Sequence, residues 1–165
     1  MNKIIFFNFN EKIDLVKIMM NYGTILRELR EEKNLSQADI ALQLNIQGKV
    51  YSQYETEYTI IPIKHLIILS DYFNVSLDFI LGFTKIKQYS KTSNILKCRL
   101  KEFRKEHKLT QEKLAQFLNT THSVIADYER NRYLIATPFL YQICRKYNIS
   151  ADYLLGKIDN PKYLK

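Results

Sequence analysis

The chain repeats itself once, at a spacing of 74 residues. Shifted by this distance, LRELREEKNLSQADIALQLN from Leu26 aligns with LKEFRKEHKLTQEKLAQFLN from Leu100. Residues 26–84 and 100–158 align without a gap and are identical at 19 of 59 positions. Chance gives only a few identities over such a length, so the chain contains one structural unit twice.

A repeat of this length predicts two small domains, because domains of ~50–200 residues can each bury a core. The polar segment KIKQYSKTSN between the copies lacks apolar periodicity and is interpreted as a linker. Residues 1–18 precede the repeat. Either translation starts at Met19 or Met20 and these residues are not made, or they form a small added helix. The predicted boundaries are an N-terminal extension at 1–19, domain 1 at 20–84, a linker at 85–94, domain 2 at 95–158 and a C-terminal tail at 159–165.

Apolar residues recur with a helical period in both copies. Leu66, Leu69, Ser70 and Phe73 stand at positions i, i+3, i+4 and i+7, and the second copy has the same stripe. Each copy is interpreted as five short helices, which makes the predicted fold class all-α. Cap residues are expected at their ends: Ser36 before the second helix, Ser76 and Ser150 before the fifth, and Gly82 and Gly156 in left-handed stops after it.

The turn between the second and third helices has a specific spacing. Ala41 and Ala115 are small where two helices must approach closely, and Asn45 and Asn119 follow four residues later. Asparagine tolerates the positive φ that a tight turn requires. This spacing fits a helix-turn-helix, although other compact helical bundles use the same residue types.

With these motifs, each copy resembles the lambda-repressor-like, or Xre-type, helix-turn-helix domain of bacterial and phage regulators. The resemblance rests on residues 26–55 with NVSLDFILG at 74–82, and on residues 100–132 with NISADYLLG at 148–156. It implies two tandem five-helix domains joined by a short polar linker. It also implies a sequence-specific DNA-binding transcriptional regulator that acts as a repressor. In this family the third helix reads the major groove, which implies the same for one or both domains here.

The resemblance assigns roles by position. Gln37 and Gln111 match a glutamine that binds backbone phosphate, and Gln47 and Thr121 match a second phosphate contact. Helix geometry adds the outward positions of the third helix, which are suited to base contacts. The resemblance adds the basic residues in the loop after this helix in domain 2. The further candidate DNA-binding residues are Gly48, Lys49, Ser52 and Gln53 in domain 1, and His122, Ser123, Asp127, Arg130 and Arg132 in domain 2.

Two ion pairs are expected to fix the third helix to its scaffold. The resemblance places Arg30 beside Glu55, and Arg104 beside Glu129, and each pair is separated by 25 residues in the sequence. We predict that both pairs are partly buried structural contacts.

The copies differ in charge. Residues 22–82 hold 5 Lys and Arg against 8 Asp and Glu, a net charge of −3, whereas residues 95–158 hold 12 against 6, a net charge of +6. Glu57 stands where the family has a basic or glycine-bearing loop, and it is expected to face phosphate. Domain 2 is therefore expected to supply most of the affinity for DNA.

Other classes of function lack support in the sequence. Two cysteines 46 residues apart and three scattered histidines have no metal-ligand spacing, and no phosphate-binding or nucleophile motif occurs. We expect no enzymatic activity, no cofactor and no metal. Cys144 is expected in the core and Cys98 at the surface. The longest N-terminal apolar run has four residues, so a cytoplasmic protein without a membrane segment is expected.

The expected partner is double-stranded DNA, because the whole chain carries a net charge of +8. Two arrangements on DNA fit: a homodimer made by two copies of domain 2, or an intrachain pseudo-dimer of domains 1 and 2. A different class of function also fits, a protein-interaction or antitoxin-like adaptor in which acidic domain 1 binds a protein partner.

Overall fold

The computed structural model describes residues 20–87, called unit 1 below, and residues 98–162, called unit 2. Every regular element within these residues is an α-helix, so the predicted all-α class is confirmed. Unit 1 contains α2 (Tyr22–Glu32), α3 (Gln37–Leu44), α4 (Gly48–Glu55), α5 (Ile63–Phe73) and α6 (Leu77–Ile80). Unit 2 contains α7 (Leu100–Glu106), α8 (Gln111–Leu118), α9 (His122–Glu129), α10 (Thr137–Tyr147) and α11 (Ala151–Leu154).

The predicted helix ends are confirmed. The Ser36 hydroxyl accepts a hydrogen bond from the Asp39 amide, and the Asp39 carboxylate accepts one from the Ser36 amide, so the two residues form a capping box. Asn45 and Asn119 end α3 and α8 with φ angles of 54° and 55°. These left-handed residues turn the chain sharply enough for the next helix to pack across the previous one.

Each unit has a core built from the predicted stripes. Leu66, Leu69, Ser70 and Phe73 of α5 are all buried. In α10 the equivalent stripe is buried except for Tyr147, which is half-buried. Cys98 is also buried, with 7% of its surface exposed, so the expectation of a surface thiol was wrong. The chain enters α7 through this residue, and its amide donates to Asn131 Oδ1, which holds it against the core.

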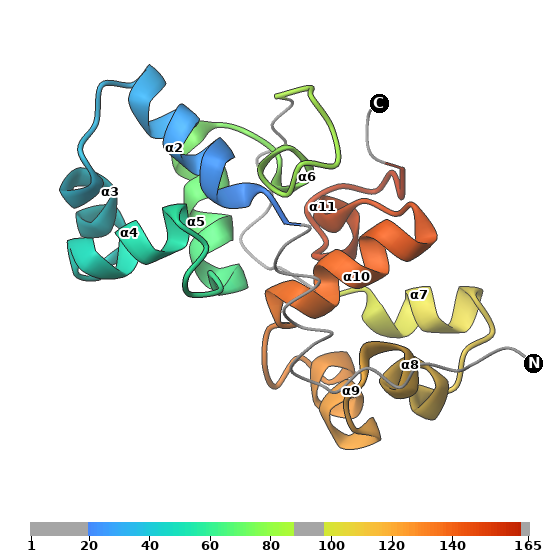
Figure 1. The fold of residues 1–165 in the computed structure, drawn as a ribbon. Coiled ribbons are helices and arrows are strands. Elements are labelled where there is room, and N and C mark those ends of the chain that lie inside the picture. The colour runs from blue at the N-terminus through green and yellow to red at the C-terminus, as the bar shows by residue number, and fades with distance from the viewer. Residues whose placement is uncertain (1–19, 88–97, 163–165) are drawn as a thin grey trace, which may run out of the picture.

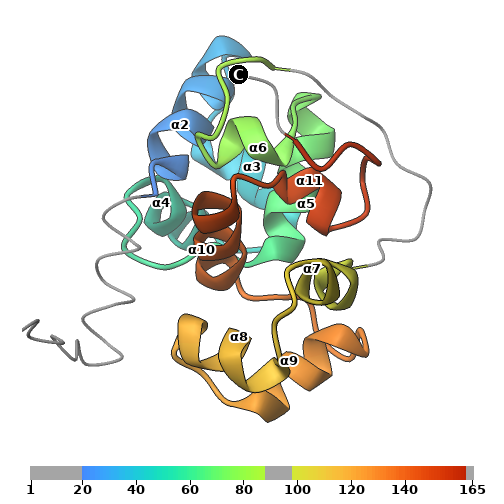
Figure 2. The same ribbon diagram turned by 90° about the vertical axis from the view of Figure 1, so that its right-hand side faces the viewer.

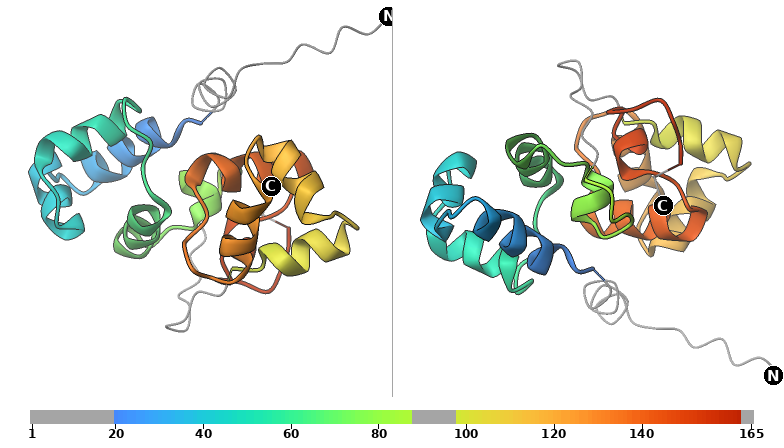
Figure 3. Two further views of the ribbon diagram at one scale, coloured as in Figure 1. Left: turned by 90° about the horizontal axis from the view of Figure 1, so that it is seen from below. Right: turned by 90° about the horizontal axis from the view of Figure 1, so that it is seen from above.

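The two units pack against each other through their last helices. Figures 1 and 2 show α6 and α11 side by side, while α4 in one unit and α9 in the other lie away from this contact. The views from below and above in Figure 3 also show the two units side by side. The interface between them is called the seam below. Each unit thus contributes one third helix, α4 from unit 1 and α9 from unit 2.

Asp78 and Asp152 make reciprocal hydrogen bonds across the seam. Asp152 of α11 accepts hydrogen bonds from the amides of Leu77 and Asp78 at the start of α6, at 3.1 and 2.9 Å. Asp78 in turn accepts from the amide of Ala151 and the hydroxyl of Ser150 at the start of α11, at 2.6 and 2.5 Å. The first amides of a helix lack partners within it, so each unit caps the last helix of the other.

A second pair of contacts flanks these caps. Phe83 of unit 1 stacks on Tyr141 of α10, with ring centroids 5.0 Å apart. On the opposite side Lys157 of unit 2 donates to the Ser70 hydroxyl at 2.7 Å and to the Asp71 carboxylate at 3.2 Å. Positions 83 and 157 are equivalent in the repeat. The backbone path is thus symmetric across the seam, whereas the chemistry is not.

Candidate nucleic-acid interface

The third helix of each unit is held across the second by a short turn. In unit 2 the Thr121 hydroxyl caps α9 by accepting from the Val124 amide. In unit 1 the equivalent Gln47 makes no side-chain cap, and α4 then begins at Gly48, beside which a Cβ would meet open space. The start of α4 therefore presents backbone amides with little side-chain cover, an arrangement suited to a phosphate group.

The inward side of α4 is fixed by Tyr51 and Tyr54, both of which are buried. Of the candidate residues on the other side, Gln47 and Lys49 are exposed. Gly48, Ser52 and Gln53 are half-buried. The Gln53 side-chain oxygen accepts from the Thr59 hydroxyl at 3.3 Å, which orients the Gln53 amide on this face.

The α9 face has the same layout and different chemistry. Thr121, His122 and Ser123 are exposed, and Asp127 is half-buried. Ala126, the counterpart of Ser52, is buried with 7% of its surface exposed. The accessible groups of α9 are therefore a hydroxyl, an imidazole and a carboxylate, whereas α4 offers an ammonium and an amide.

An Arg–Glu–Gln network ties each third helix to the first two helices. Arg30 Nε lies 2.6 Å from Glu55 Oε1, and Gln37 Nε2 donates to Glu55 Oε2 at 2.8 Å. Burial favours a raised pKa for Glu55, but the hydrogen bonds from Arg30 and Gln37 outweigh it and hold the pKa below its ordinary value. Arg27 adds a third contact to this carboxylate at 3.5 Å.

Unit 2 repeats this network. Arg104 Nε lies 2.5 Å from Glu129 Oε1, and Gln111 Nε2 donates to Glu129 Oε2 at 2.9 Å. The pKa of Glu129 is lowered in the same way, as hydrogen bonds from Arg104 and Gln111 exceed the effect of burial. In both units the glutamine is thus part of the scaffold. In each unit one N–H of the glutamine side chain is bound to the glutamate, so the second N–H is the donor that remains for a phosphate contact.

The loops after the third helices differ. In unit 2 Arg130 and Arg132 are exposed, and Arg132 Nη1 lies 3.0 Å from Asp127 Oδ1. In unit 1 Glu57 adopts a φ of 55°, and its carboxylate accepts from the Gly23 amide at 2.9 Å. A Cβ at position 23 would lie 2.5 Å from the Glu55 carbonyl oxygen, so only glycine permits this approach. The Glu57 carboxylate therefore binds the start of α2.

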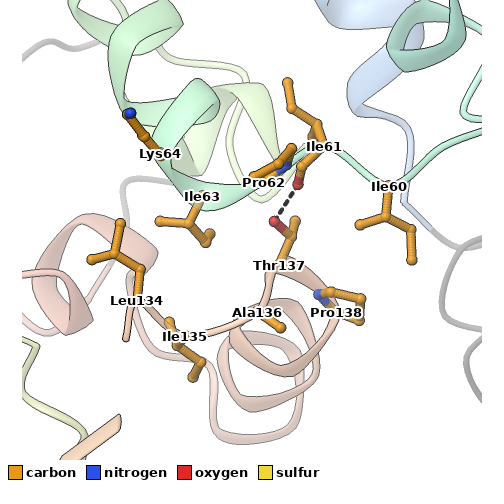
Figure 4. Close-up of a pocket in the computed structure, with 10 residues that line it drawn as sticks. All are labelled: Ile60, Ile61, Pro62, Ile63, Lys64, Leu134, Ile135, Ala136, Thr137 and Pro138. Carbon is orange, nitrogen blue, oxygen red and sulfur yellow. Dashed lines mark hydrogen bonds between the residues drawn. The ribbon is translucent and has the colours of Figure 1, made fainter. Parts of the chain in front are cut away.

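The same loops enclose an apolar groove at the seam. It is lined by residues 60–64 and 134–138 and has a volume of about 390 Å³. Figure 4 shows the loops facing each other, with the Thr137 hydroxyl directed at the Ile61 carbonyl oxygen; this hydrogen bond measures 2.5 Å. It is formed by the segments that lead into α5 and α10 and by the first residues of these two helices.

The seam residues were not identified from the sequence. Asp78 and Asp152 are the second residues of short helices, a position where an acidic side chain favours the helix without any tertiary partner. One signal was available, because aspartate occurs at the same position of both copies. Metal chemistry has no support in the described ranges, where no group of three or more His, Cys, Asp or Glu residues can hold an ion.

The family assignment agrees with this geometry. A helix-turn-helix family profile matches residues 26–80 and again residues 100–154. The chain therefore belongs to the helix-turn-helix family of the lambda-repressor-like type and contains two tandem copies of its domain. The predicted family is confirmed.

None of the helices in residues 20–87 and 98–162 is long and apolar enough to cross a membrane.

Two curated relatives come from Bacillus subtilis (strain 168). YobD, an uncharacterized HTH-type transcriptional regulator, is 38% identical over 63 residues, which are 38% of this chain and 56% of YobD. The HTH-type transcriptional regulator ImmR is 33% identical over 73 residues, which are 44% of this chain and 58% of ImmR. The chain thus spans little more than half the length of these relatives.

A solved structure of a transcriptional regulator from Listeria innocua also matches. It is 23% identical, and the match covers 70% of this chain and 98% of that one, with a TM-score of 0.38.

Proposed function

We propose that this protein is a sequence-specific DNA-binding transcriptional regulator that acts as a repressor, with α4 and α9 entering the major groove from one side of the duplex. The observation that carries this proposal is that one chain holds two equivalent helix-turn-helix units packed together through α6 and α11, with α4 in one unit and α9 in the other. Helix-turn-helix dimers bind two half-sites about one helical turn apart. Here one chain supplies both helices, as an intrachain pseudo-dimer.

Accessible polar groups support this role. Lys49 and the half-buried Gln53 stand on the outer side of α4. Ammonium groups donate to guanine, and an amide pairs with adenine through two hydrogen bonds. On α9 the His122 and Ser123 side chains are exposed, and the Asp127 carboxylate suits a cytosine amino group.

Phosphate contacts follow from the surrounding residues. We assign them to Gln37, Gln47, Gln111 and Thr121, which lie at the starts of the second and third helices, and to Arg130 and Arg132 in the loop after α9. The net charges of −3 and +6 in the two halves make unit 2 the main source of electrostatic affinity. Asp127 holds Arg132 beside the recognition face, 3.0 Å away.

The test is a mobility shift of the full chain on random duplex DNA at ~50 mM and ~200 mM salt. We expect retardation at low salt and a steep loss of affinity at high salt, because binding releases counterions from phosphate. Arg132→Ala is expected to lower the log–log salt slope by roughly 0.9, the value for one lost phosphate contact.

Lys146→Ala is the matched control, because it removes an exposed cation near the end of α10, away from the seam groove. It is expected to leave the slope unchanged. Absence of any shift at low salt contradicts DNA binding and favours the adaptor function, in which the acidic unit 1 binds a protein.

A further inference from the structure

We propose that the two units are built to pair with each other and not with their own copies, and that one chain therefore reads a DNA site made of two unlike halves. This inference rests on the proposed DNA-binding function. It excludes the alternative in which two copies of domain 2 form the DNA-binding dimer.

Lys157 of unit 2 is buried where it meets unit 1. Its side chain is 1% exposed, and its ammonium donates to Ser70 and Asp71 of the other unit. Within its own unit the Asp152 carboxylate lies 4.0 Å away. A buried ammonium requires such acceptors, because an unpaired buried charge is strongly unfavourable.

Pairing of unit 2 with a second unit 2 would remove the two acceptors from the other side of the seam. In the repeat, Cys144 occupies the position of Ser70, and Arg145 occupies the position of Asp71. Lys157 would then face a thiol and a like charge in place of a hydroxyl and a carboxylate. The same geometry is thus favourable between unlike units and repulsive between two copies of unit 2.

Pairing of unit 1 with itself loses the complementary contacts as well. Phe83, which stacks on Tyr141 at 5.0 Å, would meet Ile67, the residue equivalent to Tyr141. Ser70 and Asp71 would face that phenylalanine in place of the Lys157 ammonium. The reciprocal carboxylates at 78 and 152 are common to all pairings, so the flanking contacts specify which units meet.

The outer faces of α4 and α9 carry different side chains. Position 49 carries lysine in α4, and its counterpart in α9 is Ser123. Position 53 carries glutamine, and its counterpart is Asp127, which Arg132 contacts. Ammonium and amide groups favour guanine and adenine, whereas a carboxylate accepts only from amino groups such as that of cytosine. Two such helices held by one seam cannot prefer the same half-site sequence.

The experiment is selection of duplexes by the full chain from a random 30-base-pair pool, followed by sequencing and by the mass of the complex from light scattering. We expect one chain per duplex, and two unlike half-sites at one fixed spacing. Lys49→Ala is expected to reduce base preference about tenfold or more in one half only. Asp127→Asn is expected to change preference in the other half only.

A seam variant tests the pairing itself. Ser70→Cys with Asp71→Arg gives unit 1 the residues of unit 2, and it is expected to make the spacing between half-sites variable. Asp71→Arg alone serves if the double variant does not fold, because the Asp71 side chain is 51% exposed. Unchanged fixed spacing in both variants overturns the role of this contact.

The remaining outcomes separate the two proposals. A palindromic consensus with two chains per duplex, or a single selected half-site, overturns the unlike-halves inference and leaves DNA binding intact. No enrichment together with no retardation at low salt overturns DNA binding and the inference with it.

Discussion

Asp78→Asn is expected to stabilise the protein above neutral pH and to weaken its pH dependence. Burial, together with the nearby charge of Asp152, raises the pKa of Asp78 to about 7, compared with an ordinary value of 3.8. Asparagine keeps an oxygen for the Ala151 amide and removes one of two buried like charges. It can also donate to the Asp152 carboxylate through its side-chain amide.

The direction of the pH dependence follows from the number of protons that the folded and unfolded states bind. Between about pH 4 and pH 7 the folded protein keeps a proton on Asp78 that the unfolded chain loses, so the free energy of unfolding falls as pH rises through this range. With pKa values of 3.8 and about 7, the contribution changes by ~2–3 kcal/mol between pH 5 and pH 8. Asp78→Asn removes this contribution.

The measurement is chemical denaturation of the full chain and of Asp78→Asn at pH 5, 6, 7 and 8. The difference between the two proteins is the relevant quantity, because burial lowers the pKa of His65 and adds an opposite slope to both. Asp159→Asn is the matched control, since that side chain is 99% exposed. A difference that stays constant from pH 5 to pH 8 would refute the raised pKa of Asp78.

Three further predictions concern the contacts that hold α3, α4 and α9, of which α4 and α9 are the proposed recognition helices. Arg104→Met is expected to destabilise the protein by ~3–5 kcal/mol in chemical denaturation, because it strands the buried Glu129 carboxylate, while Lys105→Met at the exposed neighbouring position has little effect. Ser36→Ala is expected to lower the melting temperature through the loss of ~1 kcal/mol of capping energy, and an unchanged melting temperature would contradict the capping box. The lowered pKa values of Glu55 and Glu129 contribute to the free energy of unfolding above about pH 4.5, and this contribution is lost on acidification. Glu55→Gln is therefore expected to weaken the fall in the free energy of unfolding between pH 5 and pH 2, measured by chemical denaturation.

The sequence predicted the local structure well because that structure depends on short-range rules. Ser36, Asn45 and Gly82 determine helix ends through their own backbone and nearest neighbours, and all three take the expected conformations. The repeat then supplied a second copy of each signal. The helices of each unit followed from periodicity and caps, whereas their helix-turn-helix arrangement followed from the family resemblance.

The seam was not predicted, because its partners are more than 70 residues apart and each has a sufficient local explanation. Asp152 looks like a residue favouring the start of its own helix, and its bonds to the amides of Leu77 and Asp78 depend on how the units meet. Lys157 looks like one of many surface lysines, yet it is buried. Periodicity describes one helix face at a time and carries no information on the orientation of two domains.

The sequence predicted which positions of the third helices lie away from the core, but not which contacts the candidate side chains make. The outward positions of α4 and α9 follow from helix geometry once Tyr51 and Tyr54 are placed inward. The engagement of Gln37 by Glu55, and of Asp127 by Arg132, requires side-chain positions. The DNA-binding assignments of these residues stay predictions.

In the proposed complex, one chain presents two recognition helices to one side of a DNA duplex. Hydroxyl-radical footprinting of the full chain on a selected duplex tests it most directly. We predict two protected patches on the same side of the duplex, about one helical turn or ~10 base pairs apart, in a complex that contains a single chain. One protected patch, or two patches that appear only when a second chain joins the complex, would contradict the claim.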